Sequence, residues 1–420
     1  MKANKILIIN SLSKGGAQRV AVNLLRELGF DYIVVFDRKE LPYDIPASKV
    51  ISLNSPSSKG FIKKFLTLAF RFFKLKELKK RMNVCLSVSL LEPANLLNIL
   101  TKGKDKVILS FHNYYSLELC EDVYTKDSKF DRKVTLLLYK LVMKSVYNRA
   151  DLMVAVSKVL RTDLIRNFGI DNRKLITIYN PISLSKIQRN MLEPLGEYQK
   201  IFSSPTLLNM GRLTQQKGQW HLLRMLRELK KSFPELKLVI LGEGELKDSL
   251  VDFSRSLGLR TCAWDIEGLE QDADVYLVGF QKNPFKFIAR STLFVFPSLW
   301  EGLPNAILEA MACGLPIVSA DCKSGPREIL APETDPEYET KEPELARYGI
   351  LMPVLGTRYS MMNEPLDEKE KTWVKTLAEL LRNEALRKSY SERSIERAKN
   401  FDMQKLVGDW KRLLCDHGCS

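Results

Sequence analysis

The sequence predicts an α/β protein with two doubly wound parallel sheets in tandem. Three observations support this prediction. A length of 420 residues fits two domains of the usual ~150 residues or more. Both halves repeat the order strand, turn, helix, strand, which favours parallel sheets. A polar, proline-punctuated stretch near residues 185–205 separates the two halves and indicates a domain boundary.

The first half opens with an apolar strand over residues 6–10, a glycine turn over 14–16, an amphipathic helix over 17–28 and a second strand over 32–36. The pattern recurs as a strand over 107–110, a helix over 132–149 and a strand over 152–157. Each such unit is a parallel βαβ crossover.

The second half restarts with a strand over 206–210, followed by strands over 237–241, 275–278, 293–296 and 316–319. We therefore expect a Rossmann-like domain over 1–195, a second over 196–390, and a terminal helix over 391–420 that packs back toward the first domain. Two such domains would face each other across a cleft.

Charge is distributed unevenly between the halves. Residues 1–200 hold 35 Lys and Arg against 18 Asp and Glu, whereas residues 201–420 hold 30 against 32. An anionic partner of the first domain is therefore expected. The 7 cysteines are scattered and give no disulfide framework, which favours a reduced, cytoplasmic compartment. No apolar run approaches the ~20 residues of a membrane span.

The most informative motif runs from Glu301 to Glu309, directly after the strand over 293–296. Pro304 and Asn305 are expected to open a helix that Gly314 ends. The backbone N–H groups at such a helix start can hold a phosphate. Glu301 in the loop and Glu309 on the helix can accept hydrogen bonds from two different sugars. Taken alone, the two glutamates are more simply explained as capping or solvated residues.

The strand, the paired glutamates, Gly302-Leu303-Pro304 between them and the following Ala-Cys-Gly-Leu-Pro-Ile-Val-Ser resemble the retaining glycosyltransferases of family 4. Members of this family have the GT-B fold. The resemblance implies that this segment binds a nucleotide-sugar donor and that the anomeric configuration is retained.

Other stretches match the family in the expected order. Arg212 and Lys217 follow the strand over 206–210, and the resemblance implies that they contact the donor diphosphate, which suits a bidentate guanidinium and a point charge. Gly242 lies in a glycine turn after the next strand. Phe280 matches a segment beside the nucleotide base, where it either stacks on the base or packs in the core.

In the first domain, Gly15 and Gly16 let backbone approach a ligand, and the family places this loop over the donor. The alternative is a plain strand–helix turn. His112 follows the strand over 107–110, where ligands gather in doubly wound sheets, and it matches a family position near the donor sugar. The resemblance implies catalysis by His112, Glu301, Arg212 and Lys217, with no cofactor and no metal.

Residues 59–81 contain nine basic residues and one acid, interleaved with phenylalanine and leucine. This composition is typical of a helix lying on an anionic membrane, and a core-facing helix with a solvated lysine face is the alternative. The predicted contacts are Lys63, Lys64, Phe65, Phe72, Phe73, Lys74, Lys79 and Lys80. Nucleic acid is not an expected partner, because no nucleic-acid-binding motif occurs.

The sequence thus predicts a peripheral enzyme at the inner face of a bacterial membrane. It would move a hexose or N-acetylhexosamine from a nucleotide sugar, with UDP as the expected carrier, to a lipid-linked saccharide used in surface polysaccharide, lipopolysaccharide or glycoprotein-glycan assembly. A sugar-nucleotide epimerase of the same fold and a non-catalytic protein that binds sugar nucleotides or nucleic acid are the alternatives.

Overall fold

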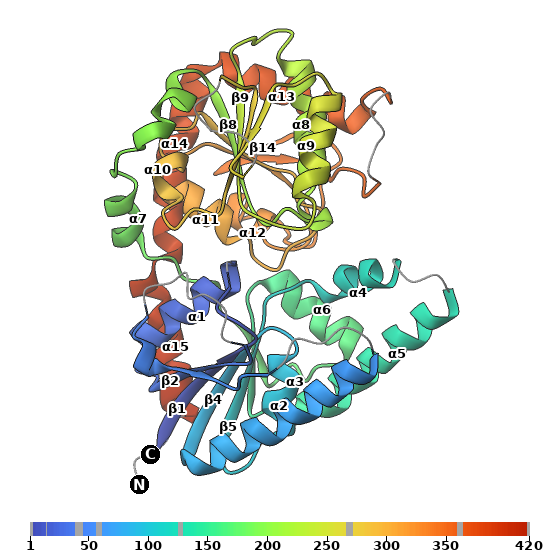
Figure 1. The fold of residues 1–420 in the computed structure, drawn as a ribbon, viewed down its shortest axis with the longest axis vertical. Coiled ribbons are helices and arrows are strands. Elements are labelled where there is room, and N and C mark those ends of the chain that lie inside the picture. The colour runs from blue at the N-terminus through green and yellow to red at the C-terminus, as the bar shows by residue number, and fades with distance from the viewer. Residues whose placement is uncertain are drawn as a thin grey trace. The chain divides into compact units, whose positions relative to one another are not determined.

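A computed structural model describes residues 3–13, 15–37, 45–55, 61–124, 129–265, 272–358 and 364–417. The chain divides into two compact units. Unit 1 is Met1–Pro181 together with Met403–Ser420, and unit 2 is Ile182–Asp402. Each unit is an α/β layer structure built on one sheet (Figure 1).

Unit 1 contains a parallel sheet in the order β3-β2-β1-β4-β5-β6-β7. Its strands are β1 (Asn4–Ile9), β2 (Tyr32–Val35), β3 (Val50–Ser52), β4 (Val84–Leu90), β5 (Lys106–Phe111), β6 (Leu152–Ala155) and β7 (Leu175–Thr177). Its helices are α1 (Gly16–Glu27), α2 (Phe61–Arg81), α3 (Ala94–Leu100), α4 (Tyr115–Tyr124), α5 (Lys129–Val146), α6 (Lys158–Phe168) and α15 (Met403–His417).

The sheet of unit 1 is apolar on both faces. Helices α1 and α15 lie beside each other on one face (Figure 1), where Leu24 and Trp410 join the same buried cluster as Leu7. Helices α2 and α3 pack on the other face around Ile6 and Leu75. Strand burial on both faces is what a parallel sheet between two helical layers requires.

Unit 2 contains a sheet in the order β10-β11-β9-β8-β12-β13-β15-β14, parallel except for the antiparallel pair of β14 and β15. Its strands are β8 (Thr206–Met210), β9 (Lys237–Leu241), β10 (Thr261–Ala263), β11 (Val275–Gly279), β12 (Leu293–Phe296), β13 (Ile317–Ala320), β14 (Glu344–Ala346) and β15 (Gly349–Met352). Its helices are α7 (Leu184–Asn190), α8 (Gln219–Leu229), α9 (Lys247–Ser256), α10 (Phe285–Ile288), α11 (Asn305–Ala312), α12 (Pro326–Leu330), α13 (Glu368–Arg382) and α14 (Glu384–Ala398).

The boundary between the units differs from the expected 195/196. The chain enters unit 2 at Ile182, because the segment after it packs on α10. The Asn283 side chain donates to the Asn190 carbonyl at 2.8 Å, and the Tyr198 and Phe287 rings lie 5.1 Å apart. The chain therefore changes packing partner at Ile182, before the polar stretch begins near residue 185.

The terminal helix also differs from the expected single element over 391–420. Helix α14 ends at Ala398 and α15 starts at Met403, so the chain returns to unit 1 after Asp402. Asp402 is extended and pairs with Ile182, while its carboxylate accepts from the N–H of Leu184 at 3.4 Å. This tertiary bridge interrupts a stretch that has no proline to stop it.

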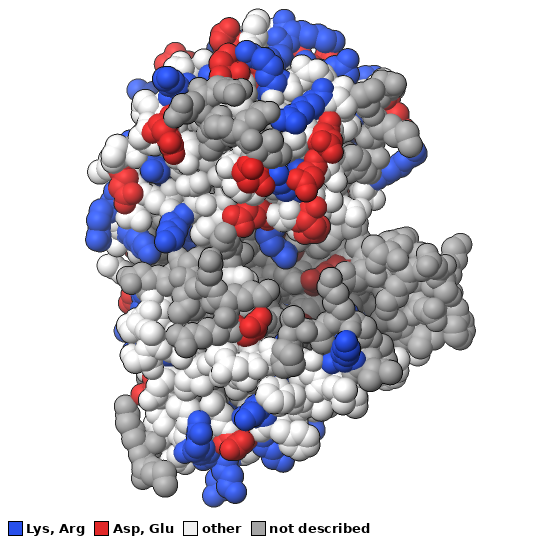
Figure 2. Space-filling model, in the orientation of Figure 1, with Lys and Arg blue, Asp and Glu red and all other residues white. Residues whose placement is uncertain are grey.

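The surface agrees with the uneven charge of the sequence. Acidic side chains are interspersed with basic ones over the visible face of unit 2, and Lys and Arg gather at one end of unit 1 (Figure 2). Among the described cysteines, Cys262, Cys313, Cys322 and Cys415 are free thiols. Cys85 is disulfide-bonded, a pairing that the scattered positions of the cysteines do not indicate.

Candidate active site

The donor motifs converge on the carboxyl edge of the unit 2 sheet. Arg212 and Lys217 follow β8, Gly242 follows β9, Phe280 follows β11 and Glu301 follows β12. These four strands are neighbours in the order β11-β9-β8-β12. Parallel strands end at a common edge, so these five residues, in four loops that span 90 residues of sequence, lie along one side of the sheet, where doubly wound folds bind ligands.

Glycine turns let the loops at this edge interlock. Gly242 has φ of +142°, and a Cβ there would lie 1.9 Å from the Gly211 carbonyl oxygen. The Gly242 N–H donates to the Gly279 carbonyl at 2.8 Å, and the Gly211 N–H donates to the Leu241 carbonyl at 3.0 Å. A side chain at Gly242 would force backbone atoms apart, so this glycine is required by the fold itself.

Lys217 and Glu301 form an ion pair at the centre of the edge. Their side chains are 14% and 8% exposed, and the ammonium lies 5.6 Å from the centre of the Phe296 ring. The Gln216 amide donates to the Trp300 carbonyl at 2.7 Å, and the Leu299 N–H donates to the Gln216 carbonyl at 2.8 Å. These two hydrogen bonds, one from the Gln216 side chain and one between backbone groups, hold the loop of Lys217 against the loop of Glu301.

Arg212 lies next to this pair in sequence but is exposed. Its backbone carbonyl accepts from the Thr214 N–H at 3.0 Å and from the Gln219 amide at 2.9 Å, which fixes the loop. Its guanidinium makes no hydrogen bond or ion pair within the described part of the chain. An exposed guanidinium on a fixed loop can bind an anionic group at little reorganisation cost.

The loop of Gly302, Leu303 and Pro304 is clamped before α11 begins at Asn305. The Glu301 N–H donates to the Lys323 carbonyl, and the Ser324 N–H donates to the Glu301 carbonyl, both at 2.8 Å. Pro304 is the N-cap of α11 and no side chain caps the helix start. Proline has no side-chain acceptor, so Pro304 itself does not cap the first N–H groups of α11.

Glu309 lies inside α11 and is 4% exposed. Burial, with the nearby charge of Glu309, raises the pKa of the Cys313 thiol above its ordinary range. The alternative explanation expects a solvated glutamate at this position. Glu309 is buried instead, which is rare for a glutamate.

Asp272-Ala273-Asp274 has the Asp-x-Asp spacing, in which two carboxylates lie close together in the sequence. This triplet precedes β11 and so lies at the amino edge of the sheet, opposite the donor motifs. Its carboxylates pair with Lys230 and Arg260, at 2.8 and 2.9 Å from Asp274. The triplet is a structural ion-pair cluster.

His221 is structural. Its Nδ1 lies 2.7 Å from the Glu370 carboxylate and its Nε2 lies 2.9 Å from the Gly356 carbonyl oxygen. Arg224 donates to the same carboxylate at 2.9 Å. Burial opposes ionisation of Glu370, but the hydrogen bonds from His221 and Arg224 outweigh it and lower its pKa to about 2. The cluster ties α8 to α13.

In unit 1, His112 lies at the carboxyl end of β5 and is 8% exposed. Its Nε2 lies 3.0 Å from the Ser110 hydroxyl. Burial lowers the pKa of His112 to about 3, so the imidazole is neutral at physiological pH. A neutral imidazole can donate one hydrogen bond and accept another.

Glu92, at the end of the neighbouring strand β4, was not identified from the sequence. Its carboxylate accepts from the Tyr147 hydroxyl at 2.7 Å. Burial, partly opposed by the Tyr147 hydrogen bond, raises the pKa of Glu92 to about 7. The sequence signal was its position directly after the alternating strand 84–90, which itself was not among the predicted strands.

Buried polar residues connect these strand ends. The Asn95 side-chain amide donates to the Ser110 backbone carbonyl at 3.0 Å, and the Ser89 hydroxyl donates to the Asn95 side-chain oxygen Oδ1 at 2.8 Å. Further along α3, the Asn98 amide donates to Ser89 at 3.2 Å. Helix α3 thus fixes the ends of β4 and β5, from which Glu92 and His112 project.

Gly15 is the N-cap of α1 and Gly16 is the first helical residue. Gly15 has φ of −179°, which any residue adopts, so its backbone conformation does not require glycine. A Cβ at Gly15 would meet the flexible end of Gln18 at 2.2 Å. Glycine at position 15 is therefore expected because of the close approach of a ligand to the backbone, which stays a prediction.

Helix α2 corrects two of the predicted membrane contacts. Lys79 is buried and its ammonium lies 2.8 Å from Asp105, so it cannot reach a lipid headgroup. Phe72 packs partly buried against the unit 1 core. The other predicted contacts, Lys63, Lys64, Phe65, Phe73, Lys74 and Lys80, are exposed. Across the described chain no helix combines the length and apolarity needed to span a bilayer.

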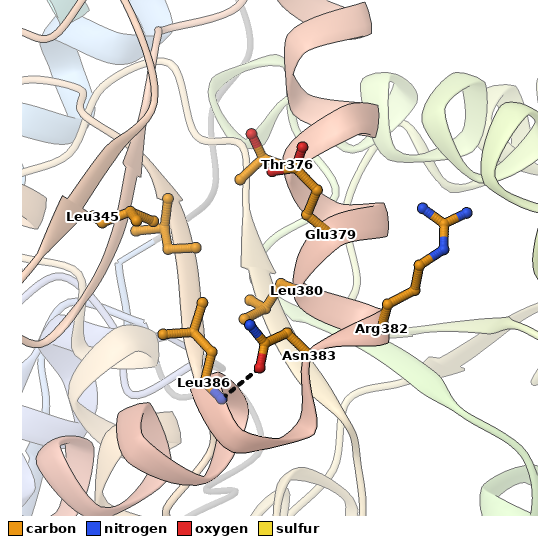
Figure 3. A pocket seen from close by; sticks show the side chains of 8 residues that line it. Leu345, Thr376, Glu379, Leu380, Arg382, Asn383 and Leu386 are labelled. Carbon is orange, nitrogen blue, oxygen red and sulfur yellow. Dashed lines mark hydrogen bonds between the residues drawn. The ribbon is translucent and has the colours of Figure 1, made fainter.

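A cavity of about 420 Å³ lies elsewhere in unit 2, between β14, β15 and the helices α13 and α14 (Figure 3). Leu345, Ile350, Leu380 and Leu386 give it an apolar lining. Asn383 at its edge accepts from the Leu386 N–H at 2.9 Å and caps α14. None of the donor motifs lines this cavity.

The fold and the site define a glycosyltransferase of GT-B fold. Residues 14–186 match Glycosyltransferase Family 4, and residues 204–345 match Glycosyl transferases group 1. The chain belongs to glycosyltransferase family 4.

Two curated relatives extend over most of the chain. An uncharacterized glycosyltransferase of Methanocaldococcus jannaschii is 34% identical over 385 residues, covering 88% of this chain and 89% of the relative. The N-acetylgalactosamine-N,N'-diacetylbacillosaminyl-diphospho-undecaprenol 4-alpha-N-acetylgalactosaminyltransferase of Campylobacter jejuni is 30% identical over 406 residues, covering 96% and 97%. Among solved structures, Anabaena HepE in complex with UDP and glucose has a TM-score of 0.70 at 15% identity, covering 98% of this chain and 100% of that one.

Proposed function

We propose that this glycosyltransferase moves a hexose or N-acetylhexosamine from a UDP-sugar to a lipid-linked saccharide, with retention of the anomeric configuration. The product would serve bacterial surface polysaccharide, lipopolysaccharide or glycoprotein-glycan assembly. The observation that carries the proposal is the Lys217–Glu301 pair at the carboxyl edge of the unit 2 sheet, beside an exposed Arg212 and the start of α11.

The chemistry begins with the departing diphosphate. As the bond to the sugar breaks, negative charge grows on the diphosphate oxygens, and Lys217, Arg212 and the N–H groups at Asn305 stabilise it. Lys217 is held by its partner loop before the donor arrives, so little reorganisation is needed. Three positive groups of the chain do the work that a divalent cation does elsewhere, which supports a metal-independent reaction.

Two glutamates and the base-side loop hold the rest of the donor. Glu301 accepts from hydroxyls of the transferring sugar, and Glu309 accepts from the ribose. Gly242 and Phe280 lie beside the base and its ribose. The HepE complex with UDP and glucose shares this fold, which supports a uridine nucleotide as the donor carrier.

His112 orients the transferring sugar or the incoming hydroxyl. Because burial lowers the pKa of its imidazole to about 3, it acts as a neutral hydrogen-bonding group. The transferring sugar passes through an oxocarbenium-like state on one face, with no protein nucleophile. Gly15 and Gly16 let backbone approach the donor phosphate and sugar.

The acceptor is a membrane-embedded amphiphile. The Campylobacter relative acts, by its name, on a diphospho-undecaprenol-linked saccharide, which supports a lipid-linked acceptor here. Exposed Lys63, Lys64, Phe65, Phe73, Lys74 and Lys80 on α2 would place the enzyme on the anionic inner face of the cell membrane.

A transfer assay tests the proposal. The protein is incubated with UDP-, GDP- and ADP-linked hexoses and N-acetylhexosamines together with a polyprenyl-diphosphate-linked saccharide. The masses of the products are then measured by mass spectrometry. We expect one added sugar from a UDP donor. Epimerised nucleotide sugar without transfer would favour the epimerase alternative, and binding without turnover would favour a non-catalytic role.

A further inference from the structure

Helix α5 carries an apolar face that the protein does not cover. Leu137, Leu138, Leu141 and Val142 are 58%, 56%, 51% and 38% exposed. Their spacing of one and four residues places all four on one side of the helix. The opposite side packs on unit 1 through buried Met143. Four adjacent aliphatic side chains in water cost free energy that a soluble helix normally avoids.

Helix α2 has a face of the same kind. Phe65, Leu66, Phe70 and Phe73 are 66%, 61%, 38% and 67% exposed, and they also fall on one side of the helix. Leu75 and Leu78 on the opposite side join the buried core. Each helix therefore has an inner apolar face that packs on unit 1 and an outer apolar face that does not.

The two helices belong to one layer. Helix α3 contacts both α2 and α5, and it packs on β4 and β5. Leu100, the last residue of α3, is itself 40% exposed. The outer faces of α2 and α5 and the exposed end of α3 thus lie on the same side of the sheet.

The charges of α5 fit an anionic surface. Helix α5 contains five basic residues, Lys129, Arg132, Lys133, Lys140 and Lys144, against one acid, Asp131. Lys144 is exposed on the flank of the apolar face. A helix with an aliphatic face and basic flank matches the acyl boundary and headgroups of an anionic bilayer.

We propose that α5 is a second membrane-contact helix, and that Leu137, Leu138, Leu141 and Val142 enter the acyl boundary on the same side of unit 1 as the outer face of α2. This proposal rests on the membrane-embedded acceptor of the proposed function. Two helices fix an orientation of unit 1 on the membrane, whereas one helix leaves rotation about its own axis free.

Vesicle flotation tests the proposal. The full-length protein is floated with phosphatidylcholine vesicles that contain roughly 30% phosphatidylglycerol, and with phosphatidylcholine alone. We expect Leu137→Gln/Leu141→Gln to lower partitioning into anionic vesicles by on the order of tenfold or more. Leu192→Gln, at a site in unit 2 that is 73% exposed, is the matched control and should float like the wild type.

Several outcomes would overturn the proposal. In the first, Leu137→Gln/Leu141→Gln and a second variant, Leu138→Gln, float like the wild type, while Phe65→Gln/Phe73→Gln does not float. This result would leave α2 as the only membrane contact of the two helices. Failure of the wild type to float with either vesicle would remove both helices. If size-exclusion chromatography shows a dimer for the wild type and a monomer for Leu137→Gln/Leu141→Gln, with unchanged flotation, the apolar face of α5 binds a second copy of the chain instead.

Sugar transfer to a short-chain, water-soluble acceptor separates this proposal from the proposed function. We expect the α5 variants to retain wild-type transfer to this acceptor, because their side chains project from the outer face of unit 1. If flotation depends on α5 but neither the wild type nor any variant transfers sugar, the proposed function is wrong and the membrane contact of α5 is still supported.

Discussion

Replacing Lys217 with methionine should reduce both stability and catalysis, through separable causes. The substitution keeps most of the apolar stem and removes the ammonium that pairs with Glu301. Because the two side chains are only 14% and 8% exposed, the remaining carboxylate is left largely buried without a counterion. Breaking a buried pair in this way costs about 3 kcal/mol, at the low end for such pairs because Lys217 is partly exposed. Urea unfolding at pH 7 measures this loss.

The double variant Lys217→Met/Glu301→Gln separates stability from catalysis. With the charge of Glu301 also removed, most of the lost stability should return, since no unpaired ion remains. Transfer should not return, because the diphosphate still lacks the Lys217 charge. We expect kcat to fall roughly 100- to 1000-fold in both variants, the loss seen when one group that stabilises developing negative charge is removed.

Lys79→Met is the matched control, since Lys79 forms a buried ion pair with Asp105 in unit 1, with side chains 5% and 2% exposed, and neither residue belongs to a donor motif. It should lose a similar free energy of unfolding while keeping kcat on a soluble acceptor. Recovery of transfer in Lys217→Met/Glu301→Gln would refute the catalytic assignment, because the pair would then act only through the fold.

Three further predictions concern other parts of the chain. Glu309→Gln should lower kcat/KM at least about 100-fold with little change in Tm, and unchanged turnover would remove its role on the ribose. Folded His112 stays neutral with a pKa of about 3, whereas the unfolded chain takes up a proton below about 6.5. The wild type should therefore lose about 2 kcal/mol more stability than His112→Gln between pH 7 and pH 5, and parallel pH curves would contradict this burial. Folded Glu370 has a pKa of about 2, so its contribution is complete above the unfolded value near 4.5 and is lost as pH falls toward 2. Glu370→Gln should then cost about 3 kcal/mol at pH 7, and an equally stable variant would show that the pairs with His221 and Arg224 are not net stabilising.

The sequence predicted the elements whose residues are apolar and consecutive. The strands 206–210, 237–241 and 293–296 occur as expected, because buried parallel strands are continuous apolar runs with a glycine or proline after them. The donor motifs were found for the same reason, since each follows one of these strands and a strand end fixes where its loop lies.

Strand β4 shows what could not be predicted so directly. Its serines, Ser87 and Ser89, alternate with apolar residues in the pattern of a strand with one solvated face, yet both are fully buried in the middle of the sheet. Ser87 donates to Asp105 at 2.7 Å, and Ser89 donates to Asn95. Ser87 and Ser89 can be buried because their hydroxyls have hydrogen-bond partners elsewhere in the chain. The alternating pattern of the strand itself does not reveal those partners.

Helix α2 was recognised from its charge and aromatic content, but its orientation was not. The sequence predicted that Phe72 and Phe65 both contact the membrane. The structure divides them, with Phe72 toward the core and Phe65 outward, because a helix with two apolar faces has no unique inward side until it packs. Lys79 turned inward for the same kind of reason, since Asp105 provides a buried partner.

The central claim is that the carboxyl edge of the unit 2 sheet binds a nucleotide sugar through Lys217, and thermal unfolding with nucleotide sugars tests it most directly. A ligand at 100 times its Kd adds about 2.7 kcal/mol, which corresponds to a rise in Tm of roughly 5–11 °C for a domain of this size. We predict this rise with a UDP-sugar for the wild type and for Lys79→Met, and its loss in Lys217→Met. A wild type whose Tm is unchanged by every UDP-, GDP- and ADP-sugar would contradict the account.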